Sequence, residues 1–124
     1  MAGWKRFFVT AAAFNVVVGA TFLVAAPDAL ALLGFAEPPD VLFHRLTGLL
    51  LLCFGAVFFV VSRAPERYRA LVLITAIGKL GVVALAAHAW ATGALPDSAF
   101  VVALGDLLYA AGFLIFLRQP SAAG

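Results

Sequence analysis

Two opposite charges stand in the middle of long apolar runs of this chain, Lys79 and Asp106. An ionisable side chain at bilayer depth costs about 2.5–3.5 kcal/mol on insertion scales, so it needs a partner or a function. At about 1.5 Å per residue, Lys79 lies near the centre of its run and Asp106 roughly 3 Å from the centre of the next run. We therefore predict that these two side chains meet.

The predicted ion pair has two interpretations. As a structural element, it fixes the register of two neighbouring helices and relieves the cost of both charges. As a functional element, it forms a proton- or ion-responsive site, because a low dielectric changes the protonation equilibria of both groups. The sequence alone leaves both interpretations standing.

Other polar residues share the layer of the predicted ion pair. Asn15 lies near the middle of the first apolar run, while Thr75 and Tyr109 each lie about one helical turn from a member of the pair. Arg45 lies roughly 10 Å outside the midplane. Its long side chain either snorkels to the surface, which we favour, or turns inward and gives the site a positive excess suited to an anionic ligand. The candidate interior polar site comprises Lys79, Asp106, Arg45, Asn15, Tyr109 and Thr75.

Small residues fall on one face of each of the first two long runs. Gly19 lies one turn after Asn15 in the first run, and Gly48 and Gly55 share a face of the second. Such faces let helix backbones approach closely inside a membrane. For Asn15 and these glycines, helix packing is the favoured role.

Metal, haem and thiol chemistry find little support in the residue spacing. Cys53 is the only cysteine, so the chain forms no internal disulfide or CxxC pair. His44 and His88 raise the idea of bis-histidine haem b. However, His88 follows Lys79 by nine residues and so points away from the predicted interior. We expect no cofactor and no metal, and the missing catalytic constellations favour a role other than that of an enzyme.

The elements that position these residues are four long apolar runs. The 124 residues are 65% apolar and only 11% charged, against about 25% charged in globular proteins. Runs of about 20 apolar residues are typical of transmembrane helices. We predict one all-α membrane domain over 1–124, an antiparallel four-helix transmembrane bundle with spans at about 5–26, 41–61, 68–91 and 98–118.

The connections between the runs carry their own signals. Pro27 and Asp28 suit the first turn of a short interfacial helix that ends at Gly34, ahead of a stop at Glu37-Pro38-Pro39. The segment 62–67 is expected to be a tight charged turn, and Asp97-Ser98 a cap for the last helix. A cleaved signal peptide over 1–26 is the competing interpretation, but the length of the run and Pro27 favour an anchor.

The basic residues predict the orientation. Lys5 and Arg6 lie at the start of the first span, Arg63, Arg67 and Arg69 lie between the second and third, and Arg118 ends the fourth. The opposite loops hold Asp28, Glu37, Asp40 and Asp97, and Arg45 is the only basic residue near that side. By the positive-inside rule, both termini face the cytoplasm of a bacterial inner membrane. Eight basic residues spread over four spans form no stripe for nucleic acid.

Several of these residues resemble those of small bacterial four-helix membrane proteins of the DoxX-like kind. The shared features are a first span that ends at a proline and a Leu-Leu-Gly helix (Pro27 to Gly34), the Arg45-x-x-Gly48 opening of the second span, and Gly55. The resemblance implies a membrane subunit, some relatives being linked to quinone- or thiosulfate-related redox complexes.

We therefore predict a small integral membrane protein that acts as an accessory or structural subunit. It would associate with the lipid bilayer and with a second copy or a larger membrane complex. One alternative is a minimal transporter or a small-molecule- or lipid-binding protein with an interior site at Lys79 and Asp106. Another is a membrane enzyme on a lipid-soluble substrate, with Asp106 or Tyr109 as the proton-transfer group.

Overall fold

A computed structural model describes residues 2–24, 27–32, 34 and 40–121, and this part of the chain is all-α. Its elements, in chain order, are α1 (Ala2–Val24), α2 (Pro27–Leu32), α3 (Val41–Arg63), the 3₁₀ helix η1 (Pro65–Tyr68), α4 (Arg69–Ala91) and α5 (Asp97–Arg118). They form two compact units, residues 1–64 and 65–124.

Four of these elements are long and apolar enough to cross a membrane: α1, α3, α4 together with η1, and α5. The shortest, α5, has 22 residues and is about 33 Å long, which exceeds the roughly 30 Å of a hydrocarbon core. The chain is therefore a multi-pass membrane protein. The predicted four spans and the short helix after the first are confirmed, with bounds shifted by up to three residues.

The short helix α2 ends where the sequence predicts. Asp28 stands in its first turn, where a carboxylate complements the helix dipole. Gly34 adopts φ +85°, and its N–H donates to Ala31 O at 3.0 Å. A glycine at the left-handed position is the common way to end a helix. Within α2, Leu30 is buried. The predicted stop at Glu37-Pro38-Pro39 lies outside the described residues.

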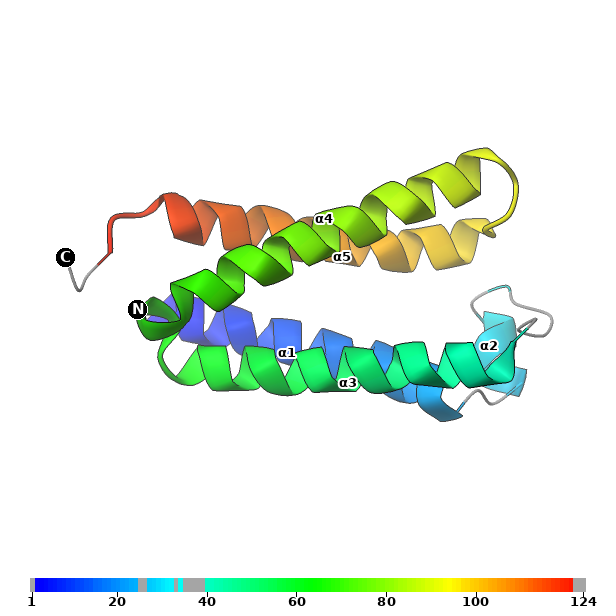
Figure 1. The fold of residues 1–124 in the computed structure, drawn as a ribbon, viewed down its shortest axis with the longest axis horizontal. Coiled ribbons are helices and arrows are strands. Elements are labelled where there is room, and N and C mark those ends of the chain that lie inside the picture. The colour runs from blue at the N-terminus through cyan, green and yellow to red at the C-terminus, as the bar shows by residue number, and fades with distance from the viewer. Residues whose placement is uncertain (1, 25–26, 33, 35–39, 122–124) are drawn as a thin grey trace. The chain divides into compact units, whose positions relative to one another are not determined.

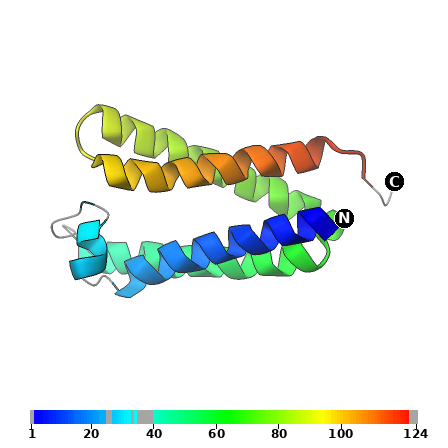
Figure 2. The same ribbon diagram turned by 180° about the vertical axis from the view of Figure 1, so that it is seen from behind.

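In the first unit, α1 and α3 lie side by side, as Figures 1 and 2 both show. Glycines make this contact close. A Cβ atom on Gly19 would lie 2.8 Å from Gly48 O, and one on Gly55 would lie 2.8 Å from Val16 Cγ2. The predicted small-residue faces are thus the faces through which these two helices touch.

In the second unit, α4 and α5 are antiparallel neighbours that cross near the middle of their lengths (Figures 1 and 2). The connecting turn contains Gly93 at φ +79°, and Ala94 N–H donates to Ala89 O at 2.8 Å. The short turn forces the two helices to be neighbours, as the sequence predicts.

Two local predictions about the connections need correction. The expected cap at Asp97-Ser98 is wrong: α5 begins at Asp97, its N-cap position is Pro96, and no side-chain cap bond is described there. Asp97 thus lies one residue inside the helix, and its Oδ1 accepts from Trp90 Nε1 at 2.7 Å. The expected turn at 62–67 is shorter, because α3 continues to Arg63 and η1 begins at Pro65.

Candidate functional site

The structure brings Lys79 and Asp106 together across the α4–α5 pair. Lys79 Nζ lies 2.5 Å from Asp106 Oδ1, an ion pair and a hydrogen bond at once. The two side chains are only 7% and 15% exposed. At such low exposure each charge is stabilised mainly by the other, because water is largely excluded from both. The predicted contact is therefore present.

Two further residues of the predicted site, Tyr109 and Thr75, lie near this pair but have different roles. Lys79 Nζ lies 5.8 Å from the centroid of the Tyr109 ring, within the range of a cation–π attraction. Thr75 is buried one turn before Lys79, but its hydroxyl donates to Leu71 O at 2.8 Å and Val72 O at 3.1 Å in its own helix. Tyr109 thus contributes to the electrostatics of the ammonium, whereas Thr75 satisfies its own backbone.

Asn15 belongs to the first unit and makes a helix–helix contact there. Its side chain is buried, and Nδ2 donates to Leu51 O of α3 at 3.3 Å. A side-chain donor to a carbonyl of the neighbouring helix is the kind of polar contact that holds transmembrane helices together. This contact fits the packing role that we favour for Asn15.

Arg45 lies on the first turns of α3 with an exposed side chain. Within the described part of the chain it makes no hydrogen bond or ion pair. Exposure near a helix end is what snorkelling requires. The alternative, in which Arg45 turns towards Asp106, joins residues of two different units and stays a prediction.

The two histidines have different surroundings. The His44 ring stacks on Phe22, with centroids 4.3 Å apart and planes inclined by 22°, so the imidazole is part of the α1–α3 contact. His88 is exposed in the last turn of α4. Among the described residues, no group of three or more His, Cys, Asp or Glu side chains is placed to hold a metal ion.

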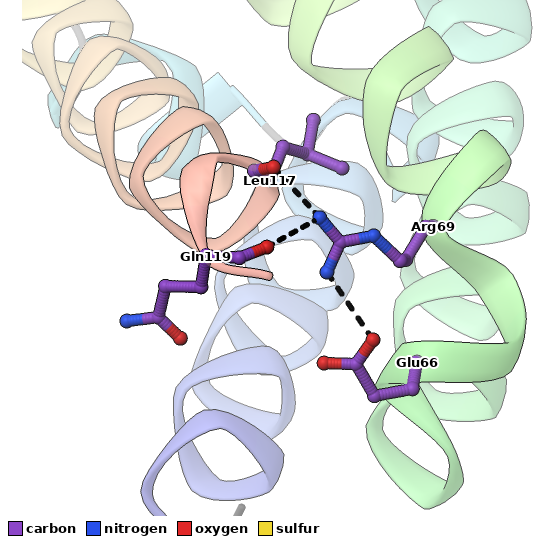
Figure 3. A network of polar contacts seen from close by, with 4 residues as sticks. All are labelled: Glu66, Arg69, Leu117 and Gln119. Carbon is purple, nitrogen blue, oxygen red and sulfur yellow. Dashed lines mark hydrogen bonds and ion pairs between the residues drawn. The ribbon is translucent and has the colours of Figure 1, made fainter. Parts of the chain in front are cut away.

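A second polar cluster, which is not predicted from the sequence, lies where α4 begins and α5 ends (Figure 3). Arg69 Nη2 donates to Leu117 O at 2.7 Å and to Gln119 O at 2.9 Å, while Nη1 lies 3.2 Å from Glu66 Oε2. The guanidinium also lies 5.1 Å from the centroid of the Phe116 ring. Arg69 therefore satisfies carbonyls that the last turn of α5 leaves without helical donors.

The sequence indicates this cluster only weakly. The spacing of Glu66 and Arg69 suggests a local pair, but the other acceptors are backbone carbonyls, which every residue possesses. From the sequence, Arg69 is predicted only to be a charge that sets the topology. Its position beside the end of another helix appears only in the fold.

The chemistry open to the Lys79–Asp106 pair is limited by its geometry. Ammonium and carboxylate together form a neutral pair, joined by the bond from Lys79 Nζ to Asp106 Oδ1. Such a pair is well suited to fix the register of α4 against α5. Breaking one partner leaves the other as a lone charge, with a cost of about 3–5 kcal/mol in buried pairs.

Comparison of the chain with protein-family models, with curated proteins and with solved structures gave no match.

Proposed function

We propose that this membrane protein acts as a small accessory or structural subunit, through association of its helices with a second copy or with a larger membrane complex. The observation that carries the proposal is the Lys79–Asp106 bond at 2.5 Å. These two charged side chains lie within the apolar length of α4 and α5, and by pairing with each other they stabilise that helix pair.

The outer faces of the long helices support the same proposal. Large apolar side chains that are more than half exposed occur on each of them, including Val17, Leu50, Ile74 and Leu108. Lipid tails and the apolar faces of other helices both satisfy such surfaces. On α4, the Gly78 and Gly81 positions have no described atom within 4 Å of a built Cβ, so another helix could approach closely there.

We further propose that the two helix pairs form one antiparallel four-helix bundle with both termini on the cytoplasmic side of a bacterial inner membrane. Within the first unit, Lys5 and Arg6 lie in the first turns of α1 and Arg63 ends α3, so three of its four basic residues lie at one end, and Arg45 is the exception. In the second, Arg69 starts α4 and Arg118 ends α5. The Ala64–Pro65 peptide bond joins these two basic ends, as the positive-inside rule requires.

The resemblance to DoxX-like proteins is a further part of this proposal. It rests on the Pro27 to Gly34 segment, the Arg45-x-x-Gly48 opening and Gly55. The membrane-subunit role that it implies agrees with the proposal, while the redox partners of some such proteins carry over only as candidates to be examined.

Association can be measured without detergent. Membranes that express the chain would be solubilised in polymer nanodiscs, and the number of copies in each particle would be counted by single-molecule photobleaching of a C-terminal fluorophore. We expect two or more copies, or one copy with a constant second protein. Particles with one copy and no other protein would refute the proposal.

The role of the ion pair can be separated from ligand binding by two variants. We expect Lys79→Met alone to lower the free energy of unfolding by about 3 kcal/mol, because it leaves Asp106 as a lone buried charge. The double variant Lys79→Met/Asp106→Leu should regain most of that loss, since it buries no charge. Unfolding by SDS in mixed micelles, followed by circular dichroism, measures both.

The same double variant decides between the main proposal and the alternatives. If it folds and assembles like the wild type, the pair is structural. If it folds but loses a cellular phenotype or ligand binding, the Lys79–Asp106 site belongs to a transporter, a ligand-binding protein or an enzyme instead. Arg45→Gln then tests whether a third, positive residue contributes to that site.

A further inference from the structure

An open groove of about 450 Å³ lies along the second unit, near the end of α5. One side is Leu73 of α4, and the rest is formed by the last two turns of α5, namely Ala111, Leu114, Ile115, Leu117 and Arg118. Five of the six lining residues are apolar. Arg118 is the one charged residue of this lining, and it is the last residue of the span.

The dimensions of the groove fit part of a lipid chain. From Ala111 to Arg118 the helix rises about 10 Å. An acyl chain lying along this path with its headgroup at Arg118 would run from the membrane surface about a third of the way through a hydrocarbon core of about 30 Å. The volume also lies within the range of about 300–1,000 Å³ that is typical of small-molecule sites.

The charge at the end of the groove is available to a ligand. Arg118 is exposed, and within the described residues it makes no hydrogen bond or ion pair. A guanidinium binds phosphate oxygens in a bidentate manner, and basic pockets between transmembrane helices recognise anionic headgroups in this way. Glu66, at the same end of the unit, is already paired with Arg69.

The Arg69 cluster removes an obstacle to anion binding at this position. The carbonyls at the C-terminus of a helix carry partial negative charge and repel an anion. Here the carbonyl oxygens of Leu117 and Gln119, on either side of Arg118, both accept hydrogen bonds from Arg69 (Figure 3). The carbonyls next to Arg118 in the chain are therefore already bonded to a cation, which reduces their repulsion of an anion at this end of α5.

We propose that this groove binds an anionic phospholipid, with one acyl chain between Leu73 and the last two turns of α5 and the phosphate on Arg118. Phosphatidylglycerol, with one negative phosphate and no ammonium group, has this chemistry. A zwitterionic lipid offers the same chain, but its own ammonium group opposes the local positive charge. The site is separate from Lys79 and Asp106 and does not depend on their role.

The test uses the full chain in nanodiscs of phosphatidylcholine, titrated with phosphatidylglycerol and followed by native mass spectrometry of the released protein–lipid complexes. The wild type should retain phosphatidylglycerol in preference to phosphatidylcholine. Arg118→Gln should weaken that retention about tenfold, the effect of losing one charge-assisted contact. Ala111→Phe fills the groove without changing any charge and should weaken retention of both lipids.

Arg6→Gln is the matched control, because it removes the same charge from the other unit and should leave retention unchanged. Equal retention of the two lipids by the wild type would overturn the proposal. So would Arg118→Gln retaining phosphatidylglycerol like the wild type, or losing it no more than Arg6→Gln does, which would indicate general charge attraction. Arg118 is exposed, so this variant decides the question even if Ala111→Phe does not fold.

Discussion

Replacement of Gly48 with alanine should destabilise the α1–α3 pair, although alanine is the better helix former. A Cβ atom at this position would lie 2.6 Å from Gly19 O and would also collide with the backbone nitrogen of Leu23. Both obstacles are backbone atoms of α1, so no side-chain rotation can relieve the overlap. The two helices would have to separate or slide.

The size of the effect follows from two opposing contributions. Overpacking in a closely packed contact costs about 1–3 kcal/mol, and a collision with backbone belongs to the upper part of that range. Against it stands the gain of up to about 1 kcal/mol when alanine replaces glycine inside a helix. We therefore expect Gly48→Ala to lower the free energy of unfolding by about 1–2 kcal/mol.

The chain contains a matched control for this prediction. Gly78 lies in the middle of α4, and a Cβ built on it meets no described atom within 4 Å. Gly78→Ala makes the same chemical change without the collision, so it should leave stability unchanged or raise it by up to about 1 kcal/mol. SDS titration in mixed micelles, with circular dichroism as the signal, compares the two variants.

A Gly48→Ala protein as stable as the wild type would refute the reasoning, because it would mean that α1 and α3 do not approach through this glycine. Gly19→Ala provides an independent check from the opposite helix, since its Cβ would lie 2.8 Å from Gly48 O. The double variant should cost less than the sum of the two single changes, because the first alanine already separates the same surfaces.

Two further predictions concern the ends of the α4–α5 pair. Arg69→Gln should lower the free energy of unfolding by about 1.5 kcal/mol, the lower end for bonds to a charged group, because its side chain is 22% exposed. Arg67→Gln removes the same charge from an exposed position and should change little; equal losses in SDS titration would contradict the prediction. Trp90→Phe should cost less than about 1 kcal/mol, since it loses the bond to Asp97 but keeps the stack on Phe100, whose centroid lies 4.5 Å away. Trp90→Ala loses both contacts, so equal stability of these two variants in the same titration would refute the role of the stack.

Much of the fold follows from hydropathy and connectivity. The contact between Lys79 and Asp106 could be predicted because a short turn makes α4 and α5 antiparallel neighbours, so equal depth implies proximity. Helical phase likewise placed Gly19, Gly48 and Gly55 on facing surfaces. These predictions needed only the rise per residue and the period of the helix.

The contacts that the sequence does not reveal depend on where each helix begins and ends. The sequence predicts that Asp97-Ser98 caps α5, but the helix already includes Asp97, whose carboxylate accepts from Trp90. For Arg69 the sequence predicts only a topological role, because its acceptors include the carbonyls of Leu117 and Gln119. A backbone acceptor has no signature in residue type, so such a contact emerges only when the helix ends are placed.

The Arg69 contacts also impose an order on the biogenesis of the second unit. Glu66 is three residues away and can pair with the guanidinium as soon as this stretch is synthesised, whereas Leu117 follows Arg69 by 48 residues. Until α5 has crossed the bilayer and its end lies on the side where α4 begins, Glu66 is the partner among these contacts that Arg69 can reach. The bond to Leu117 O then joins the start of α4 to the end of α5. For α5 to leave the membrane, the bond between Arg69 and Leu117 would first have to break.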